Sequence, residues 1–173
     1  MFRKYIPYAH AKTIYEIPVE FYLKHNVKYL FTDLDNTLDS YKLYKAGDKA
    51  IQLIDKIKKA GIEPIIISNN HGDRVSSYAN SVAVRFHPST MKPFSFKLKK
   101  FMTENNIDPS EVMFVGDQLM TDVRACYGAN IRCIYTEKLV KEDQFTTHFN
   151  RFFERFVKAY HNKKGNLKDW RTL

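Results

Sequence analysis

Cysteine is scarce in this chain and long apolar runs are missing. Only two of the 173 residues are cysteine, Cys126 and Cys133, which is too few for a disulfide framework, and neither belongs to a cluster of metal ligands. No apolar run approaches the roughly 20 residues of a membrane-spanning helix, and the N-terminus lacks the apolar core of a signal peptide. These absences predict a cytoplasmic protein with reduced thiols.

Low-complexity tracts, internal repeats and linkers are also absent. A length of 173 residues, with 44% hydrophobic and 27% charged residues, suits one globular domain with a proper core, so residues 1–173 are predicted to fold as a unit. Residues 1–26 carry aromatic residues and prolines without a long helical stripe. We interpret them as a packed lead-in to that domain.

Acidic residues are too few to balance the basic ones, and the net charge is +9 with an isoelectric point near 9.4. Such an excess indicates an anionic partner, which is a nucleic acid, an anionic membrane surface or a phosphorylated substrate. Charge alone does not choose among these three. No aromatic and basic RNA-recognition motif is present, so a nucleic-acid partner is not expected.

From Val27 onward, strand-like and helix-like patterns alternate. Runs rich in β-branched and aromatic residues predict five strands, at 27–32, 62–67, 82–86, 112–115 and 131–135. Apolar residues at helical spacing predict helices at 18–24, 46–60, 73–81, 97–104 and 119–127. Strands that alternate with helices pair in parallel through right-handed crossovers. The predicted fold class is therefore α/β, a three-layer α/β/α sandwich around a parallel five-stranded core sheet.

Residues 145–161 form a predicted basic amphipathic helix. Aromatic and apolar residues recur there at helical spacing: Phe145, Phe149, Phe152, Phe153, Phe156, Val157 and Tyr160. Arginines and lysines decorate the other faces. Such a helix either docks on its own core or anchors the protein at a membrane surface. Docking is favoured because an exposed aromatic stripe is a liability in a soluble protein.

The first predicted strand ends in two aspartates, Asp33 and Asp35, with Thr37 two residues further on. Two carboxylates repel each other, and burying either one without a partner costs roughly several kcal/mol. A cation is therefore expected between the two carboxylates. The alternative is a turn in which aspartate only makes local hydrogen bonds.

Polar residues also follow the next three strands. The second strand ends in Ser68 and Asn69, Lys92 follows the third, and the fourth ends in Gly116-Asp117-Gln118-x-x-Thr121-Asp122. Alone, each has an ordinary explanation as a helix cap or a solvated surface residue. Because the carboxyl ends of parallel strands meet at one edge of the sheet, their joint occurrence predicts a ligand site there.

In this order, the four segments resemble the four motifs of the haloacid-dehalogenase-like (HAD) phosphohydrolases. The Gly-Asp-Gln-x-x-Thr-Asp form is typical of subfamily IIIA. The resemblance extends to the bacterial YqeG family through three further stretches: Asn70 with Arg74-Val75, Lys92-Pro93, and Asn150-Arg-Phe-Phe-Glu154. It covers most of the chain and is looser before Val27. It implies a HAD-like Rossmannoid fold and a phosphatase.

The resemblance also implies roles for these residues. Mg²⁺ is the expected cofactor, held by the carboxylates of Asp33 and Asp117 and by the backbone carbonyl of Asp35. Asp122 is expected to complete the metal site by holding a metal-bound water, or else to orient Lys92. Asp33 is the expected nucleophile, forming an aspartyl-phosphate, and Asp35 is the acid and base. The expected substrate-binding residues are Ser68, Asn69, Lys92 and Thr37, the last as a brace of the turn.

Short connections between the predicted strands leave no room for a cap domain. Only 39–61 separates the first strand from the second, and 68–92 is equally short. An open site favours a bulky substrate. The YqeG resemblance suggests phosphatidylglycerophosphate, a lipid with an anionic headgroup. The protein would then bind peripherally at the inner face of the membrane. Two alternatives stay open: a phosphatase for a soluble nucleotide, sugar or phosphoprotein, and an RNA-associated basic protein with a vestigial site.

Overall fold

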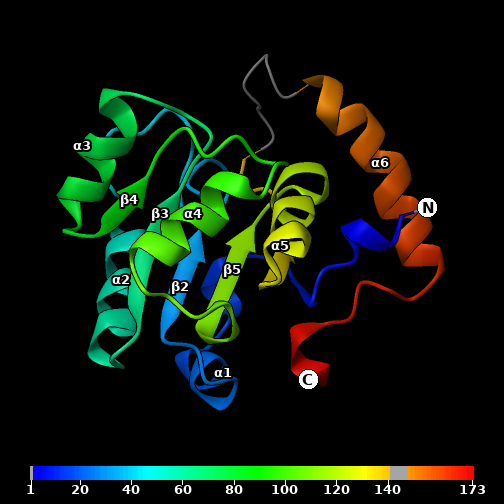
Figure 1. The fold of residues 1–173 in the computed structure, drawn as a ribbon, viewed down its shortest axis with the longest axis horizontal. Coiled ribbons are helices and arrows are strands. Elements are labelled where there is room, and N and C mark those ends of the chain that lie inside the picture. Colours follow the sequence, from blue (N-terminus) through cyan, green and yellow to red (C-terminus); the bar gives the residue numbers. More distant parts are fainter. Residues whose placement is uncertain (1, 141–147) are drawn as a thin grey trace.

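A six-stranded parallel sheet forms the middle layer of the protein (Figure 1). The computed structural model describes residues 2–140 and 148–173, and residues 148–152 by their backbone alone. The strands are β1 (Ala9–Ala11), β2 (Tyr29–Thr32), β3 (Glu63–Ile67), β4 (Arg85–His87), β5 (Val112–Gly116) and β6 (Arg132–Thr136). Their order across the sheet is β1-β6-β5-β2-β3-β4.

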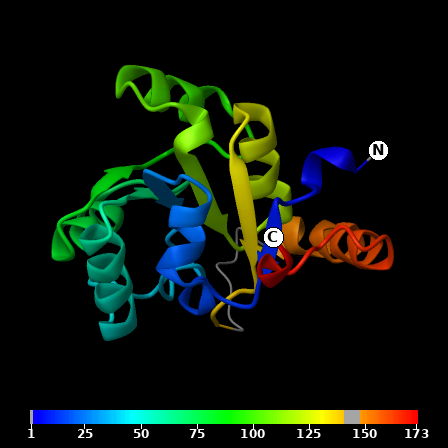
Figure 2. The same ribbon diagram turned by 90° about the horizontal axis from the view of Figure 1, so that it is seen from below.

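Helices cover both faces of this sheet, as the view from below shows (Figure 2). The α-helices are α1 (Val19–Lys24), α2 (Asp48–Lys59), α3 (Asp73–Ser81), α4 (Phe96–Glu104), α5 (Arg124–Ala129) and α6 (His148–Lys163). One core cluster joins residues of α1, α2 and α3 to one face of the sheet, and a second joins α4, α5 and α6 to the other. The predicted three-layer α/β/α architecture is confirmed.

Alternation along the central strands produces these two cores. Leu30 of β2 and Met113 of β5 belong to the cluster under α1 to α3, whereas their neighbours Phe31 and Phe114 belong to the cluster under α4 and α5. Phe31 lies beside Phe114 in the register of the sheet. Strands buried on both faces read as continuous apolar runs, which is why the sequence pattern marked them so clearly.

The predicted number of strands was wrong, because the lead-in supplies a sixth. Ala9–Ala11 pairs in parallel with β6 and aligns Ala9 with Ile134. Three residues are too short for a visible alternation, and alanine is a poor strand former. Both alanines are nonetheless buried, since a small side chain fits beneath the covering layers at this edge.

Helix α6 docks on the protein through a narrow face that includes Glu154, Val157 and His161, all buried. His161 contacts the backbone carbonyl of Phe2 through Nε2 at 3.1 Å. The expected docking is therefore present. Among the described aromatic residues of the stripe, Phe156 is 61% exposed, whereas the ring of Tyr160 lies 5.2 Å from that of Phe2. Phe145 lies outside the described residues, as do the side chains of Phe149 and Phe152.

The predicted helix 119–127 begins as one π-helical turn, Leu119–Val123, and continues as α5. Between β2 and β3 lie only a turn and α2, and between β3 and β4 only α3, so the described chain inserts no cap at either place. None of its helices is long and apolar enough to cross a bilayer. The connections that leave the carboxyl ends of β2 and β3 are short (Figure 1).

Candidate active site

Lys92 joins polar groups that lie at or just after the ends of three different strands. Its ammonium pairs with Asp33 Oδ1 at 2.7 Å and Asp122 Oδ1 at 2.8 Å, and it donates to the carbonyl of Ile67 at 3.0 Å. An ammonium has three N–H donors, so all three are used. The side chain is 2% exposed although it follows the short edge strand β4. The sequence around Lys92 is typical of a surface lysine, but the side chain is buried and connects three strand ends through ion pairs and a hydrogen bond.

A third carboxylate, that of Asp117, lies beside the two that pair with this ammonium. Asp33, Asp117 and Asp122 are buried, and each offers an oxygen within 4.8 Å of the others. The group is net negative when all its members are ionised, because three carboxylates outnumber one ammonium. An all-oxygen donor set with excess negative charge fits a hard divalent cation such as Mg²⁺. The predicted metal ligands Asp33, Asp117 and Asp122 therefore lie together. β2 and β5 are neighbours in the sheet, but the chain after β2 continues to β3 and the chain after β5 continues to β6 on the other side, so the ligands lie at the point where the strand order reverses.

Burial raises the pKa of Asp33 to about 7, and the charges of Asp122 and Asp35 add to the effect while Lys92 opposes it. Burial would lower the pKa of Lys92, but Asp122 and Asp33 overcome this and raise it. The lysine is therefore charged throughout the physiological range. Asp33 is the carboxylate whose ionised form is costly in the metal-free protein.

Asp122 is held at both oxygens. Oδ1 pairs with Lys92, and Oδ2 accepts from the backbone N–H of Gln118 at 3.0 Å. The carboxylate also packs on Gly116, where a Cβ would lie 2.5 Å from Oδ2. This environment favours the orienting role for Asp122 over the alternative of holding a metal-bound water.

Asn69 is turned toward the chain that carries Lys92. Its Nδ2 donates to the Lys92 carbonyl at 2.8 Å, and its Oδ1 accepts from the Lys92 N–H at 2.7 Å and from Thr90 Oγ1 at 2.9 Å. The side chain of this predicted phosphate ligand thus fixes the lysine loop. Ser68 is buried beside it, and its Oγ accepts from the N–H of Asn70 at 3.1 Å.

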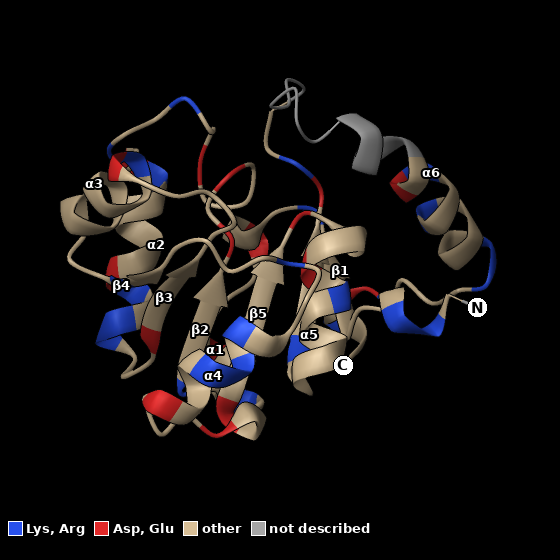
Figure 3. Ribbon diagram, turned by 45° about the horizontal axis from the view of Figure 1, so that its top comes forward, with Lys and Arg blue, Asp and Glu red and all other residues tan. Residues whose placement is uncertain are grey.

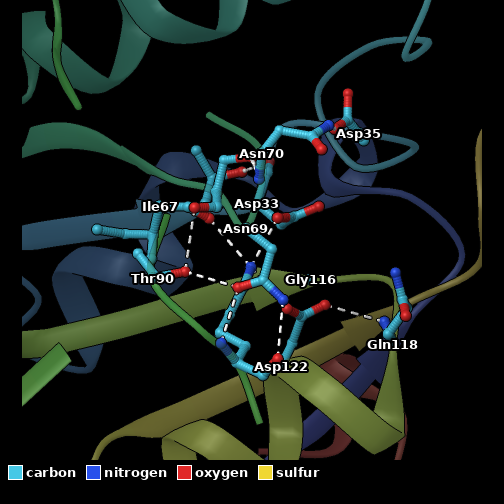
Figure 4. Close-up of polar contacts among 12 residues, drawn as sticks. Asp33, Asp35, Ile67, Asn69, Asn70, Thr90, Gly116, Gln118 and Asp122 are labelled. Carbon is cyan, nitrogen blue, oxygen red and sulfur yellow. Dashed lines mark hydrogen bonds and ion pairs between the residues drawn. The ribbon is translucent and has the colours of Figure 1, made fainter. Parts of the chain in front are cut away.

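Asp35 turns toward the first turn of α3. Its Oδ2 accepts from Asn70 Nδ2 at 2.5 Å, and its Oδ1 pairs with Arg74 Nη1 at 2.6 Å. Figure 4 places Asp35 and Asn70 on the opposite side of Asp33 from Asp122. Arg74 had no role in the sequence-based prediction. Its spacing of four residues from Asn70, at the start of a helix, was the available signal.

The predicted brace Thr37 is 1% exposed, inside the compact turn that follows Asp35. The N–H of Leu38 donates to the carbonyl of Leu34 at 3.1 Å and closes this turn. Thr37 is therefore placed where it can support the turn.

Glu154 is a second residue to which sequence analysis assigned no role. It lies on α6 and is 4% exposed, and its Oε1 accepts from the N–H of Leu119, the first residue of the π-helical turn that carries Asp122. The C-terminal helix thereby supports the loop of Asp117. A separation of 35 residues hides this contact from local pattern analysis.

The charge distribution agrees with this arrangement. Several acidic segments lie near the ends of β2 and β5 and others lie elsewhere on the surface, while lysines and arginines are spread over the outer helices and loops (Figure 3). The concentrated negative charge at the strand ends is thus a property of the site within a basic protein.

Residues 1–136 match the family model described as "Haloacid dehalogenase-like hydrolase". The chain belongs to this family. It is also 29% identical over 164 residues to "Probable phosphatase YqeG" of Bacillus subtilis (strain 168), a match that covers 95% of both chains.

Solved structures share the fold. The 3-deoxy-D-manno-octulosonate 8-phosphate phosphatase of Moraxella catarrhalis, solved with magnesium ion, phosphate ion and KDO, superimposes with a TM-score of 0.52 at 16% identity, over 81% of this chain and 91% of that one. An uncharacterized protein from Listeria monocytogenes serotype 4b superimposes with a TM-score of 0.54 at 12% identity, over 77% of this chain and 99% of that one. The family and the acidic site together confirm the prediction of an enzyme of the phosphatase type.

The raised pKa of Asp33 predicts how stability depends on pH. The folded protein keeps this proton up to a pKa of about 7, whereas the unfolded chain loses it near 3.8. Ionisation therefore favours unfolding, and the free energy of unfolding without metal should fall between pH 4 and 7 by at most about 1.4 kcal/mol per pH unit from this group. Denaturant titrations in EDTA measure this, and millimolar Mg²⁺ should restore stability at pH 7.5. An equal slope in Asp33→Asn would contradict the assignment.

Gly116→Ala should disturb the site through Asp122. The added Cβ would lie 2.5 Å from Oδ2, so the carboxylate must move away from Lys92. We expect a loss of about 1–3 kcal/mol in stability and weaker Mg²⁺ binding by calorimetry. Gly47→Ala is the matched control, because the nearest atom to its Cβ would be Asp39 Oδ1 at 3.4 Å. Unchanged Mg²⁺ affinity in Gly116→Ala would refute the role given to this contact.

Proposed function

We propose that the protein is a Mg²⁺-dependent phosphomonoester hydrolase that works through a phosphorylated Asp33, and that its substrate phosphate is carried on a lipid headgroup, as in phosphatidylglycerophosphate. The observation that carries the chemical part is the buried carboxylate of Asp33, with Lys92 on one oxygen and two further carboxylates close by. Mg²⁺, held by Asp33, Asp117 and the Asp35 carbonyl, would cancel charge on the phosphate dianion so that a carboxylate can approach it.

The residues then divide the work. Asp33 attacks phosphorus, the ester P–O bond breaks, and an aspartyl-phosphate forms that water later hydrolyses. Lys92 faces the phosphoryl oxygens and offsets their charge, while Asp122 holds it in place. Ser68 and the backbone N–H of Asn69 complete the phosphate contacts, since the Asn69 side chain is engaged with the lysine loop.

Asp35 supplies the proton step. It protonates the leaving oxygen in the first half-reaction and takes a proton from the attacking water in the second. A second carboxylate two residues after the nucleophile is what this alternation requires, and a phospho-accepting receiver domain would lack it.

The lipid part rests on the rim of the open site. Met91 and Phe94 flank Lys92 in a turn closed by a 3.0 Å hydrogen bond between their backbones, and they are 49% and 62% exposed. Phe96, 54% exposed, opens α4, and the exposed Lys99 follows one turn later on the same side of that helix. Exposed aromatic residues beside lysines suit an anionic bilayer surface. A soluble phosphorylated substrate, for which no such rim is needed, remains the competing choice.

Purified protein should release phosphate from phosphatidylglycerophosphate in vesicles with Mg²⁺, and EDTA should stop it. Asp33→Asn should lower this rate about a thousandfold or more, because no carboxylate nucleophile remains. A parallel panel of nucleotide, sugar and protein phosphates identifies a soluble substrate if one is preferred. Full activity of Asp33→Asn would disprove the covalent mechanism.

Replacing the rim should weaken contact with membranes. Phe94→Ser with Phe96→Ser should lower partitioning onto anionic vesicles about tenfold or more, since burying one phenylalanine contributes about 1.5–3 kcal/mol. Hydrolysis of a short soluble phosphate ester should stay unchanged. Leu23→Ser is the control, because Leu23 is 49% exposed on α1, at the other end of the sheet (Figure 1). Equal partitioning of the double variant and the control onto anionic vesicles would contradict the proposal that Phe94 and Phe96 contact the membrane.

A further inference from the structure

Asp35 is held at both carboxylate oxygens by residues of the neighbouring segment. Asn70 donates to Oδ2 at 2.5 Å and Arg74 pairs with Oδ1 at 2.6 Å. The two side chains of the ion pair are largely buried, at 19% exposure for Asp35 and 12% for Arg74. A second guanidinium nitrogen of Arg74 donates to the carbonyl of Ser40 at 3.1 Å. The guanidinium is thus fixed between the turn after β2 and the start of α3.

The position of Arg74 makes little sense as helix stabilisation. It is the second residue of α3, and the N-terminal end of a helix disfavours a cation because the backbone dipole is positive there. The arginine therefore depends on the carboxylate of Asp35 and on the Ser40 carbonyl for its stability at this place. Both of these lie in the turn that also carries Asp33, so the pair fixes that turn against α3.

We infer that Arg74 is a positioning residue for Asp35: together with Asn70 it holds this carboxylate in the one orientation from which it can serve the oxygen that leaves phosphorus. A guanidinium and an amide NH₂ group only donate, so neither competes for the proton that Asp35 transfers. The inference rests on the proposed hydrolase function and adds a residue to it. Without Arg74, the Asp35 side chain could rotate away from the leaving oxygen between turnovers.

Substrates with different leaving groups separate this role from general support of the fold. An alkoxide is a poor leaving group and needs the proton from Asp35, whereas p-nitrophenolate leaves without one. The value of kcat/KM reports phosphoryl transfer to Asp33, before water enters. Loss of acid positioning must therefore appear in kcat/KM for an alkyl phosphate and largely spare p-nitrophenyl phosphate.

The experiment compares wild type, Arg74→Met, Arg74→Lys and Arg85→Ala on glycerol phosphate and p-nitrophenyl phosphate with Mg²⁺. Arg74→Met keeps the apolar stem, and we expect its kcat/KM to fall at least tenfold more on the alkyl ester than on the aryl ester. Arg74→Lys should recover part of this loss. Arg85→Ala removes a guanidinium that pairs with Glu63 far from Asp35, and it should not alter the ratio of the two rates.

A double-mutant cycle gives the second readout. Arg74→Met should cost nothing further in kcat/KM on glycerol phosphate once Asp35 is replaced by Asn, because Arg74 acts through Asp35. An equal loss on both esters, or an undiminished loss in the Asp35→Asn background, would overturn the inference while leaving the hydrolase intact. Inactivity of the wild type on every phosphate ester would instead overturn the proposed function, and this inference with it.

Discussion

One buried ammonium group holds the site together. Lys92 uses its three donors on Asp33, Asp122 and a backbone carbonyl of β3, and each partner comes from a different strand end. Removing the lysine would leave the buried carboxylates of Asp33 and Asp122 without their cation, at a cost of several kcal/mol, roughly. The surrounding residues serve the same contact. Gly116 leaves room for Asp122, and Asn69 fixes the backbone from which the lysine reaches inward.

The sheet order explains why these residues meet at all. β2 lies between β5 and β3, so the aspartates after β2 and β5 emerge side by side, and the chain after β4 closes over them from the edge. The N–H of Asp33 still donates to the Val115 carbonyl at 2.9 Å, which continues the strand pairing into the first residue of the site. The backbone of the candidate nucleophile is therefore fixed to the sheet by a strand-type hydrogen bond.

Much of this could be predicted from sequence, because it depends on local patterns. Apolar runs marked five of the six strands, and the polar residues after four of them marked the site. The edge strand Ala9–Ala11 escaped because three residues carry no usable alternation. The contacts of Glu154 and Arg74 escaped for a different reason. They join segments 35 and 39 residues apart, and only packing brings such segments together. Asn69 follows β3, but the direction of its side chain depends on a loop whose shape no sequence pattern encodes.

The contact from Glu154 to Leu119 has a consequence for synthesis of the protein. The chain leaves the ribosome from its N-terminus, and the strands with their four motifs are complete by residue 136. The loop of Asp117 nevertheless receives its last backbone partner from a helix that emerges later. A nascent chain can therefore assemble its sheet during translation, while the cation pocket matures only after α6 has been released and has packed against the π-helical turn.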